Sequence, residues 1–200
     1  MLLFVVGVLS ACTTTLTLDT VQQSQGVHAS GNLRPGMVKL SPKAEGIDNP
    51  VGRAHTVFYI PTKRVRIAGD AGEELMKTVK RALELAGYRV RVEGSTATTL
   101  PLVKCRVEEF WFSNYTWMFP FVPTWGAARL TLTAESSYGV RWSRSFSAHA
   151  FSARPFDGFS AAANDAMRVI LGEMVDAFTS DEFYYAVVTK QSQITSRSGI

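Results

Sequence analysis

The chain has 200 residues, of which 46% are hydrophobic and 19% charged, and it carries a formal net charge of +4. This composition excludes a collagen-like repeat, a disulfide-stapled miniprotein and a wholly disordered chain. A chain of this length buries enough surface for one ordinary hydrophobic core, so we expect one folded domain.

Residues 1–11, MLLFVVGVLSA, form an uncharged apolar run directly before Cys12. The run is shorter than the roughly 18 to 20 residues that a transmembrane helix needs, and it is typical of an export signal. Its last residues, Leu9-Ser10-Ala11-Cys12, resemble the bacterial lipobox, which implies cleavage before Cys12 and lipid attachment to the Cys12 thiol. Residues 1–11 are therefore predicted to be a signal peptide. The alternative is a first strand or core helix that ends in an ordinary buried thiol.

The lipobox resemblance also implies a cellular location. Two or more acyl chains on Cys12 would hold the protein stably, because each buried methylene contributes about 0.8 kcal/mol. Thr13 stands where enteric-type lipoproteins retained in the inner membrane often carry Asp, so the resemblance implies the periplasmic face of the outer membrane. With Cys12 lipidated, only Cys105 remains, so the chain has no second thiol for an internal disulfide.

Residues 12–55 are predicted to be a lipidated N-terminus and a polar tether. They are rich in Thr, Ser, Gln, Gly and Pro, and such a segment does not bury enough apolar surface to repay its ordering entropy. A short strand over 37–40 is the one regular element that we consider within it. The periplasmic domain is predicted over 56–190, followed by a flexible tail over 191–200.

Hydrophobic periodicity places the elements of this domain. Val57–Ile60 suits a buried strand that ends at Pro61. Helical spacing between a cap at Asp70 and a stop at Gly87 predicts a helix over 72–86. Alternating residues predict strands over 88–92, 103–108, 130–134 and 140–150. The last two form a hairpin in which Arg144 marks an edge, a bulge or the point where the strand leaves the core. A long helix from about 158 to 178 and a short one over 183–189 follow.

This element order predicts an α+β fold, a two-layer sandwich in which two amphipathic helices pack on a mostly antiparallel sheet. The lipobox, the helix ending in ELAGYRV, the run of strands and the TSDEF that follows an alanine-rich helix together resemble the YajG-like bacterial lipoproteins. The resemblance covers roughly residues 12–190 and implies an envelope lipoprotein without catalytic residues. The same order is similar to the lipoprotein plug of the lipopolysaccharide export machine and to auxiliary lipoproteins of lipid-transporting ABC systems.

The segment from Phe110 to Trp125 is the predicted partner surface. Pro120 and Pro123 disfavour a regular strand through it, so we expect a protruding loop or hairpin end. Its aromatic rings would suit an envelope protein, a second copy of the chain, a lipid or the bilayer surface. Alternatively, the loop folds over the sheet and supplies core. The candidate partner-binding residues are Phe110, Trp111, Phe112, Tyr115, Trp117, Phe119, Phe121 and Trp125.

Patterns that carry chemistry are scarce. His28, His55 and His149 lack the spacing of metal ligands. Glu108 and Glu109 are adjacent on a predicted strand, so they should point to opposite faces and could not act as an acid–base pair. No nucleotide-binding glycine motif is present in the sequence. We therefore expect no catalytic residues, no metal and no cofactor.

The positive charge comes largely from arginines on the predicted strands. Gathered on one face, they would attract the phosphates of lipid headgroups or lipopolysaccharide, although ordinary solvated strand faces explain the same residues. Nucleic acid is not an expected partner of an exported lipoprotein. The predicted function is a non-catalytic assembly or accessory component of an envelope complex. The alternative is an accessory lipoprotein of lipid or lipopolysaccharide transport that contacts the lipid directly.

Overall fold

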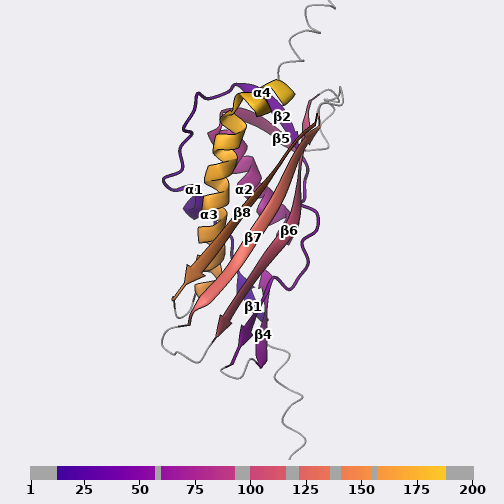
Figure 1. Cartoon of the computed structure of the whole chain (residues 1–200). Helices are drawn as coiled ribbons and strands as arrows, with labels where there is room; N and C mark the ends of the chain where they lie inside the picture. Colours follow the sequence, from indigo (N-terminus) through magenta and orange to yellow (C-terminus); the bar gives the residue numbers. More distant parts are fainter. Residues whose placement is uncertain are drawn as a thin grey trace, which may run out of the picture.

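The computed structural model of the chain describes residues 13–56, 60–92, 100–115, 122–135, 141–154 and 157–187. These residues form one eight-stranded sheet and four helices (Figure 1). The strands are β1 (Thr13–Leu16), β2 (Gly36–Leu40), β3 (Gly52–His55), β4 (Pro61–Ile67), β5 (Tyr88–Val92), β6 (Leu102–Tyr115), β7 (Thr124–Glu135) and β8 (Arg141–Ser152). The helices are α1 (Thr20–Ser24), α2 (Ala71–Leu85), α3 (Gly158–Thr179) and α4 (Asp181–Val187).

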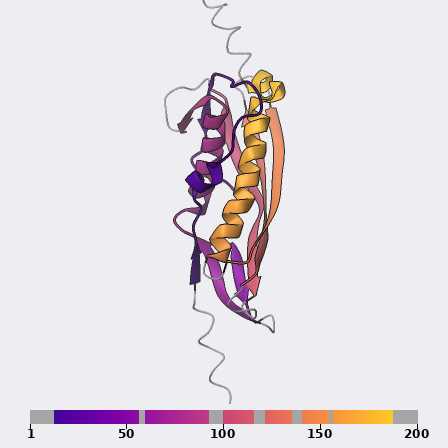
Figure 2. The ribbon, with the colours of Figure 1, turned by 90° about the vertical axis from the view of Figure 1, so that its left-hand side faces the viewer.

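The helices and the sheet form two layers, with α2 and α3 side by side on one face of the sheet (Figure 2). The long strands β6, β7 and β8 are antiparallel neighbours, whereas β2 and β3 join β6 in parallel pairs. Helix α3 packs across β6, β7 and β8, and α2 packs against α3 and β5. The predicted α+β sandwich with a mostly antiparallel sheet is confirmed.

Strand β6 connects the two halves of the sheet. Along one side it pairs with β7 from Leu102 to Asn114. Along the other side it pairs with β2 near its start and with β3 near its end. The short strands β4 and β1 then extend the sheet beyond β3, so that β1 lies at one edge and β8 at another.

Local signals place the helices as predicted. The Asp70 side chain accepts a hydrogen bond from the Glu73 backbone N–H at 3.1 Å, and α2 ends before Gly87, whose φ of 96° is a left-handed conformation. Helix α3 presents small buried side chains such as Ala162, Ala163 and Ala166. Small side chains let a helix axis lie close to the layer that it covers, which suits the central position of α3.

The prediction of a polar tether over residues 12–55 is wrong for the described part, 13–55. Strand β1 pairs with β4, β2 pairs with β5 and β6, and β3 pairs with β4 and β6. The segment also supplies core residues such as Leu16 and Val38, both fully buried. The strand considered over 37–40 is confirmed as β2, whereas residues 191–200 lie outside the described residues.

Buried polar contacts explain how such a polar segment becomes ordered. The Asn164 side chain on α3 accepts hydrogen bonds from the Asp19 backbone N–H and the Gln23 amide, both at 2.8 Å. Its own amide donates to the Thr17 carbonyl at 2.9 Å. The Gln23 side chain, fully buried, also accepts a hydrogen bond from Thr78 on α2 at 2.8 Å. The polar side chains of the segment thus find partners inside the domain, which removes the cost of burying them.

The structure also bears on two smaller strand predictions. Val57–Tyr59 lies outside the described residues, and Pro61 begins β4 rather than ending a strand, a position at which its missing N–H is tolerated. The hairpin of β7 and β8 is confirmed and longer than predicted. Arg144 lies opposite Leu132 in an uninterrupted register, so it marks an edge strand and not a bulge.

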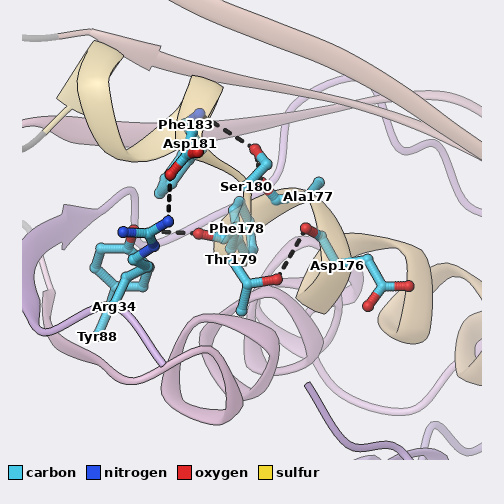
Figure 3. A network of polar contacts seen from close by, with 9 residues as sticks. All are labelled: Arg34, Tyr88, Asp176, Ala177, Phe178, Thr179, Ser180, Asp181 and Phe183. Carbon is cyan, nitrogen blue, oxygen red and sulfur yellow. Dashed lines mark hydrogen bonds and ion pairs between the residues drawn. The ribbon is translucent and has the colours of Figure 1, made fainter. Parts of the chain in front are cut away.

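A polar network fixes the junction of α3 and α4 (Figure 3). The Tyr88 hydroxyl donates to the Phe178 carbonyl at 3.1 Å, and the Arg34 guanidinium forms an ion pair with Asp181. The Ser180 hydroxyl accepts from the Phe183 backbone N–H at 3.3 Å, which caps the start of α4. Burial raises the pKa of the Tyr88 hydroxyl above its ordinary value. The network holds the loop that contains Arg34 against the helical layer.

We expect Asn164→Leu to lower the free energy of unfolding by about 2 to 4 kcal/mol. The substitution leaves the buried Gln23 amide and two backbone groups of the N-terminal segment without their hydrogen-bond partner. Chemical denaturation followed by circular dichroism measures the change. The control is Asp165→Ala at the exposed neighbouring position, which should change stability by less than about 0.5 kcal/mol. Equal effects of the two substitutions would contradict the role of Asn164.

We expect alkaline pH to destabilise the domain partly through Tyr88. Its pKa is raised in the folded state, so the folded protein holds the phenolic proton more tightly and loses stability as pH rises above about 10, the ordinary tyrosine value. Tyr88→Phe should therefore lose less stability than the parent between neutral and alkaline pH. The exposed Tyr185→Phe is the control and should follow the parent curve. A Tyr88→Phe curve parallel to that of the parent would show that Tyr88 does not contribute.

Candidate interaction surface

Strand alternation divides the aromatic segment between core and surface. Phe110 and Phe112 lie in β6 and are buried, at 7% and 0% exposure, and their rings are 5.2 Å apart. Trp111 on the same strand is 39% exposed, and Trp125 on β7 is 43% exposed. The predicted loop is therefore wrong for Phe110–Tyr115 and for Trp125. Pro123 lies directly before the start of β7 and does not interrupt a strand, whereas Pro120 lies outside the described residues.

This division between core and surface reduces the set of predicted partner-binding residues. Phe110 and Phe112 face the helical layer and are core residues, so they are removed as contact candidates. Trp111, Tyr115 and Trp125 lie on the opposite face of the sheet, which we call the outer face. The remaining candidates, Trp117, Phe119 and Phe121, lie outside the described residues.

Exposed rings gather on the outer face near one end of the sheet. Trp125 lies between Ser113 of β6 and Phe151 of β8 in the strand register, and Phe151 is 63% exposed. The Tyr115 ring stacks on Trp125 at 4.8 Å between centroids and on His55 of β3 at 5.2 Å. We call Trp111, Tyr115, Trp125 and Phe151 the aromatic surface. A shallow depression lies between Trp111, Trp125 and His149.

Arginines border the aromatic surface on the β3 and β4 side. The Arg53 guanidinium lies 6.0 Å from the centre of the Trp111 ring, a cation–π distance. Arg64 stands directly opposite Arg53 in the β3–β4 register, and both residues are exposed. Within the part of the chain that the structure describes, neither arginine forms an ion pair. Two like charges held side by side favour an anionic ligand.

The other end of the outer face is polar and electrically balanced. The pairs Thr131–Ser145 and Thr133–Ser143 carry hydroxyl groups across β7 and β8, and the first pair is in hydrogen-bond contact at 2.7 Å. Arg129 lies 4.0 Å from Glu109. The outer face therefore changes from aromatic and basic at one end to hydroxyl-rich at the other.

The two adjacent glutamates were wrongly expected on opposite faces. The β6–β7 register shifts between Val107 and Glu109, which places an extra residue in β6. Glu108 accepts a hydrogen bond from Thr131 and Glu109 meets Arg129, so both carboxylates lie on the outer face. Among the described residues, no group of His, Cys, Asp and Glu is arranged to hold a metal ion.

Other arginines expected near the sheet are scattered. Arg89 and Arg91 lie on β5, which joins the sheet near the start of β6, far along the strand from Trp111. Arg144 lies over the Phe146 ring at 5.8 Å on β8. Arg53, which the sequence did not single out, lies opposite Arg64 in the β3–β4 register and beside the exposed Trp111 ring. No local sequence pattern connects them, because strand pairing alone brings them together.

No protein-family model matches the chain, and no curated protein matches it. Among solved structures, the chain is similar to XCC0632 from Xanthomonas campestris, described as a member of family DUF330. The identity is 13%, the TM-score is 0.53, and the match covers 92% of this chain and 99% of that one. A PelC dodecamer from Paraburkholderia phytofirmans matches at 13% identity and a TM-score of 0.39, over 74% of this chain and 95% of that one. The first likeness shows the fold, and the second is too weak to support an argument.

The packing around Gly126 leaves no room for a side chain at this position. A Cβ atom there would lie 2.3 Å from the Phe112 ring and 2.4 Å from the Trp111 carbonyl oxygen. We expect Gly126→Ala to destabilise the domain by about 1 to 3 kcal/mol, because the buried ring has no room to move. Gly172→Ala on α3 is the control, since a Cβ there meets nothing within 4 Å. It should stabilise the helix by up to about 1 kcal/mol in the same thermal denaturation experiment. A Gly126→Ala variant as stable as the parent would contradict the packing of Phe112 against Gly126 across the strands.

Proposed function

We propose that this chain is a lipid-anchored bacterial envelope protein whose periplasmic domain acts as a non-catalytic assembly or accessory component. The observation that carries the proposal is the position of Thr13. Strand β1 begins at Thr13, directly after the lipobox cysteine, so a lipid on Cys12 would hold the sheet itself close to the membrane. A stable attachment needs two or more acyl chains, which the lipobox resemblance implies.

The aromatic surface supports a role in binding rather than in chemistry. It exposes large rings from three strands, and the depression beside it is shallow. Of the polar side chains that line the depression, Ser113 accepts a hydrogen bond from the Trp111 indole and Glu109 lies 4.0 Å from Arg129. A folded monomer seldom leaves such rings in water without a use. On this proposal the protein belongs on the periplasmic face of the outer membrane, as the Thr13 position after the lipobox implies.

A second candidate function is direct handling of lipid or lipopolysaccharide. The observation that favours it is the arginine pair, Arg53 and Arg64, beside the exposed Trp111 ring. Guanidinium groups bind phosphate in bidentate geometry, and an aromatic ring can contact an acyl chain. This candidate predicts that a phospholipid or glycolipid, distinct from the anchor, co-purifies with the extracted protein in a fixed molar ratio.

Intact-mass spectrometry of the protein extracted from envelopes tests the anchor. We expect a chain that begins at Cys12 and carries three acyl groups, whereas Cys12→Ala should yield an unacylated chain. Cys105→Ala is the matched control. Cys105 is buried, and desolvation raises the pKa of its thiol to about 12, so it stays protonated and unreactive. An unprocessed and unacylated parent chain would contradict the proposal.

A further inference from the structure

The inference concerns what covers the aromatic surface, and it rests on the proposed lipid anchor at Cys12. The strand register places the start of β1 and the aromatic surface at the same end of the sheet. Thr13 pairs with Arg64, Arg64 with Arg53, and Arg53 with Ser113. Ser113 then pairs with Trp125, and Trp125 with Phe151. Figure 1 shows β1, β4 and the adjoining ends of β6, β7 and β8 together at the lower end of the molecule.

The chemistry of this end matches a bilayer surface. Tryptophan and tyrosine are enriched at the depth of lipid headgroups, where the ring is partly apolar and its polar group remains hydrated. The Trp111 indole N–H donates to the nearby Ser113 hydroxyl at 3.1 Å, and the residue is 39% exposed. Ile60, immediately before β4 at the same end, is 56% exposed. These side chains suit an interface that is apolar on one side and wet on the other.

Charge points to an anionic partner. Arg53 and Arg64 lack ion-pair partners among the described residues, and both belong to the register row that contains Thr13. Carboxylates also border Trp111: Glu109 lines the depression beside it, and Asp48 and Glu108 line a neighbouring depression. Glu108 and Glu109 are engaged by Thr131 and Arg129. Basic side chains beside a lipid anchor strengthen attachment to anionic lipids.

The change in polarity along the outer face also indicates that the aromatic end, and not the hydroxyl-rich end, faces the membrane. The hydroxyl-rich pairs of β7 and β8 lie on the side of Trp111 away from β1, where water is the expected neighbour. If a protein partner covered the whole outer face, the face would not need an aromatic, basic end and a separate hydroxyl-rich end. We propose that the aromatic surface, together with Arg53 and Arg64, rests on the headgroups of an anionic phospholipid bilayer, beside the lipid on Cys12.

An environment-sensitive label on the full-length lipidated protein tests this contact. In a Cys105→Ala background, Phe151→Cys is labelled with the fluorophore NBD, and the protein is reconstituted into phosphatidylcholine vesicles with or without phosphatidylglycerol. We expect the label to brighten and shift to shorter wavelength when phosphatidylglycerol is present. Val169→Cys, at an exposed position of α3, is the control and should keep the spectrum of a label in water.

Charge reversal tests the arginines. Arg53→Glu plus Arg64→Glu should return the label at position 151 to the spectrum seen with phosphatidylcholine alone, and so should high salt, which screens exposed charges. Arg89→Glu plus Arg91→Glu reverses two exposed charges on β5 and should leave the shift unchanged. Circular dichroism and melting temperature confirm that each variant is folded.

Vesicle flotation separates failure of this inference from failure of the anchor. A protein that floats with the vesicles while the label at position 151 stays in water overturns the bilayer contact and leaves the anchor standing. A protein that does not float overturns the proposed anchor and this inference with it. A spectral shift that appears only after envelope proteins are added would assign the surface to a protein partner and would also overturn the bilayer contact.

Discussion

The alternation of side chains along β6 is the constraint on which the structure depends. This strand pairs with β7 over nearly its whole length and holds β2 and β3 on its other side. Its inward side chains, Val103, Cys105, Phe110 and Phe112 among them, supply the core beneath the helices. The extra residue near Glu108 shifts the alternation by one position. Beyond it, the period of two that turns Phe110 and Phe112 inward places Trp111 and Tyr115 on the outer face. Core and candidate interaction surface are therefore two consequences of one strand.

The second feature on which the structure depends is the packing of the N-terminal segment against the helices and the sheet. Asn164 and Gln23 supply buried hydrogen bonds that offset the polarity of this segment, and Leu16 and Val38 add apolar burial. Strand β1 therefore begins at Thr13 without an intervening tether in the described residues. An anchor on Cys12 would restrict the orientation of the domain, since a short attachment permits far less rotation than a long flexible one. With such an anchor, the fold itself could determine how the domain is oriented relative to the membrane.

The sequence predicted the features that depend on neighbouring residues. The cap at Asp70, the stop at Gly87 and the periodicity between them located α2 within one residue at each end. Features that depend on distant partners could not be predicted. Asn164 lies more than 140 positions from the residues that it orders, and Arg53 and Arg64 meet only through strand pairing.

Two errors arose from local rules that tertiary structure overrode. Pro123 does not prevent a strand on either side of the segment, because it lies just before β7 rather than within it. The alternation of Phe110, Trp111 and Phe112 was visible and would have divided them between core and surface. The extra residue near Glu108 left no comparable signal, because a bulge is set by the register with β7.

The central claim is that the end of the sheet that carries Trp111 and Trp125 lies against a membrane, beside the anchor proposed at Cys12. Hydroxyl-radical footprinting of native envelopes, compared with detergent-extracted protein, measures the solvent exposure of these two rings directly. The account predicts that both are protected in the envelope and become reactive on extraction, while Tyr185 on α4 reacts in both states. Equal reactivity of Trp111 and Trp125 before and after extraction would contradict it.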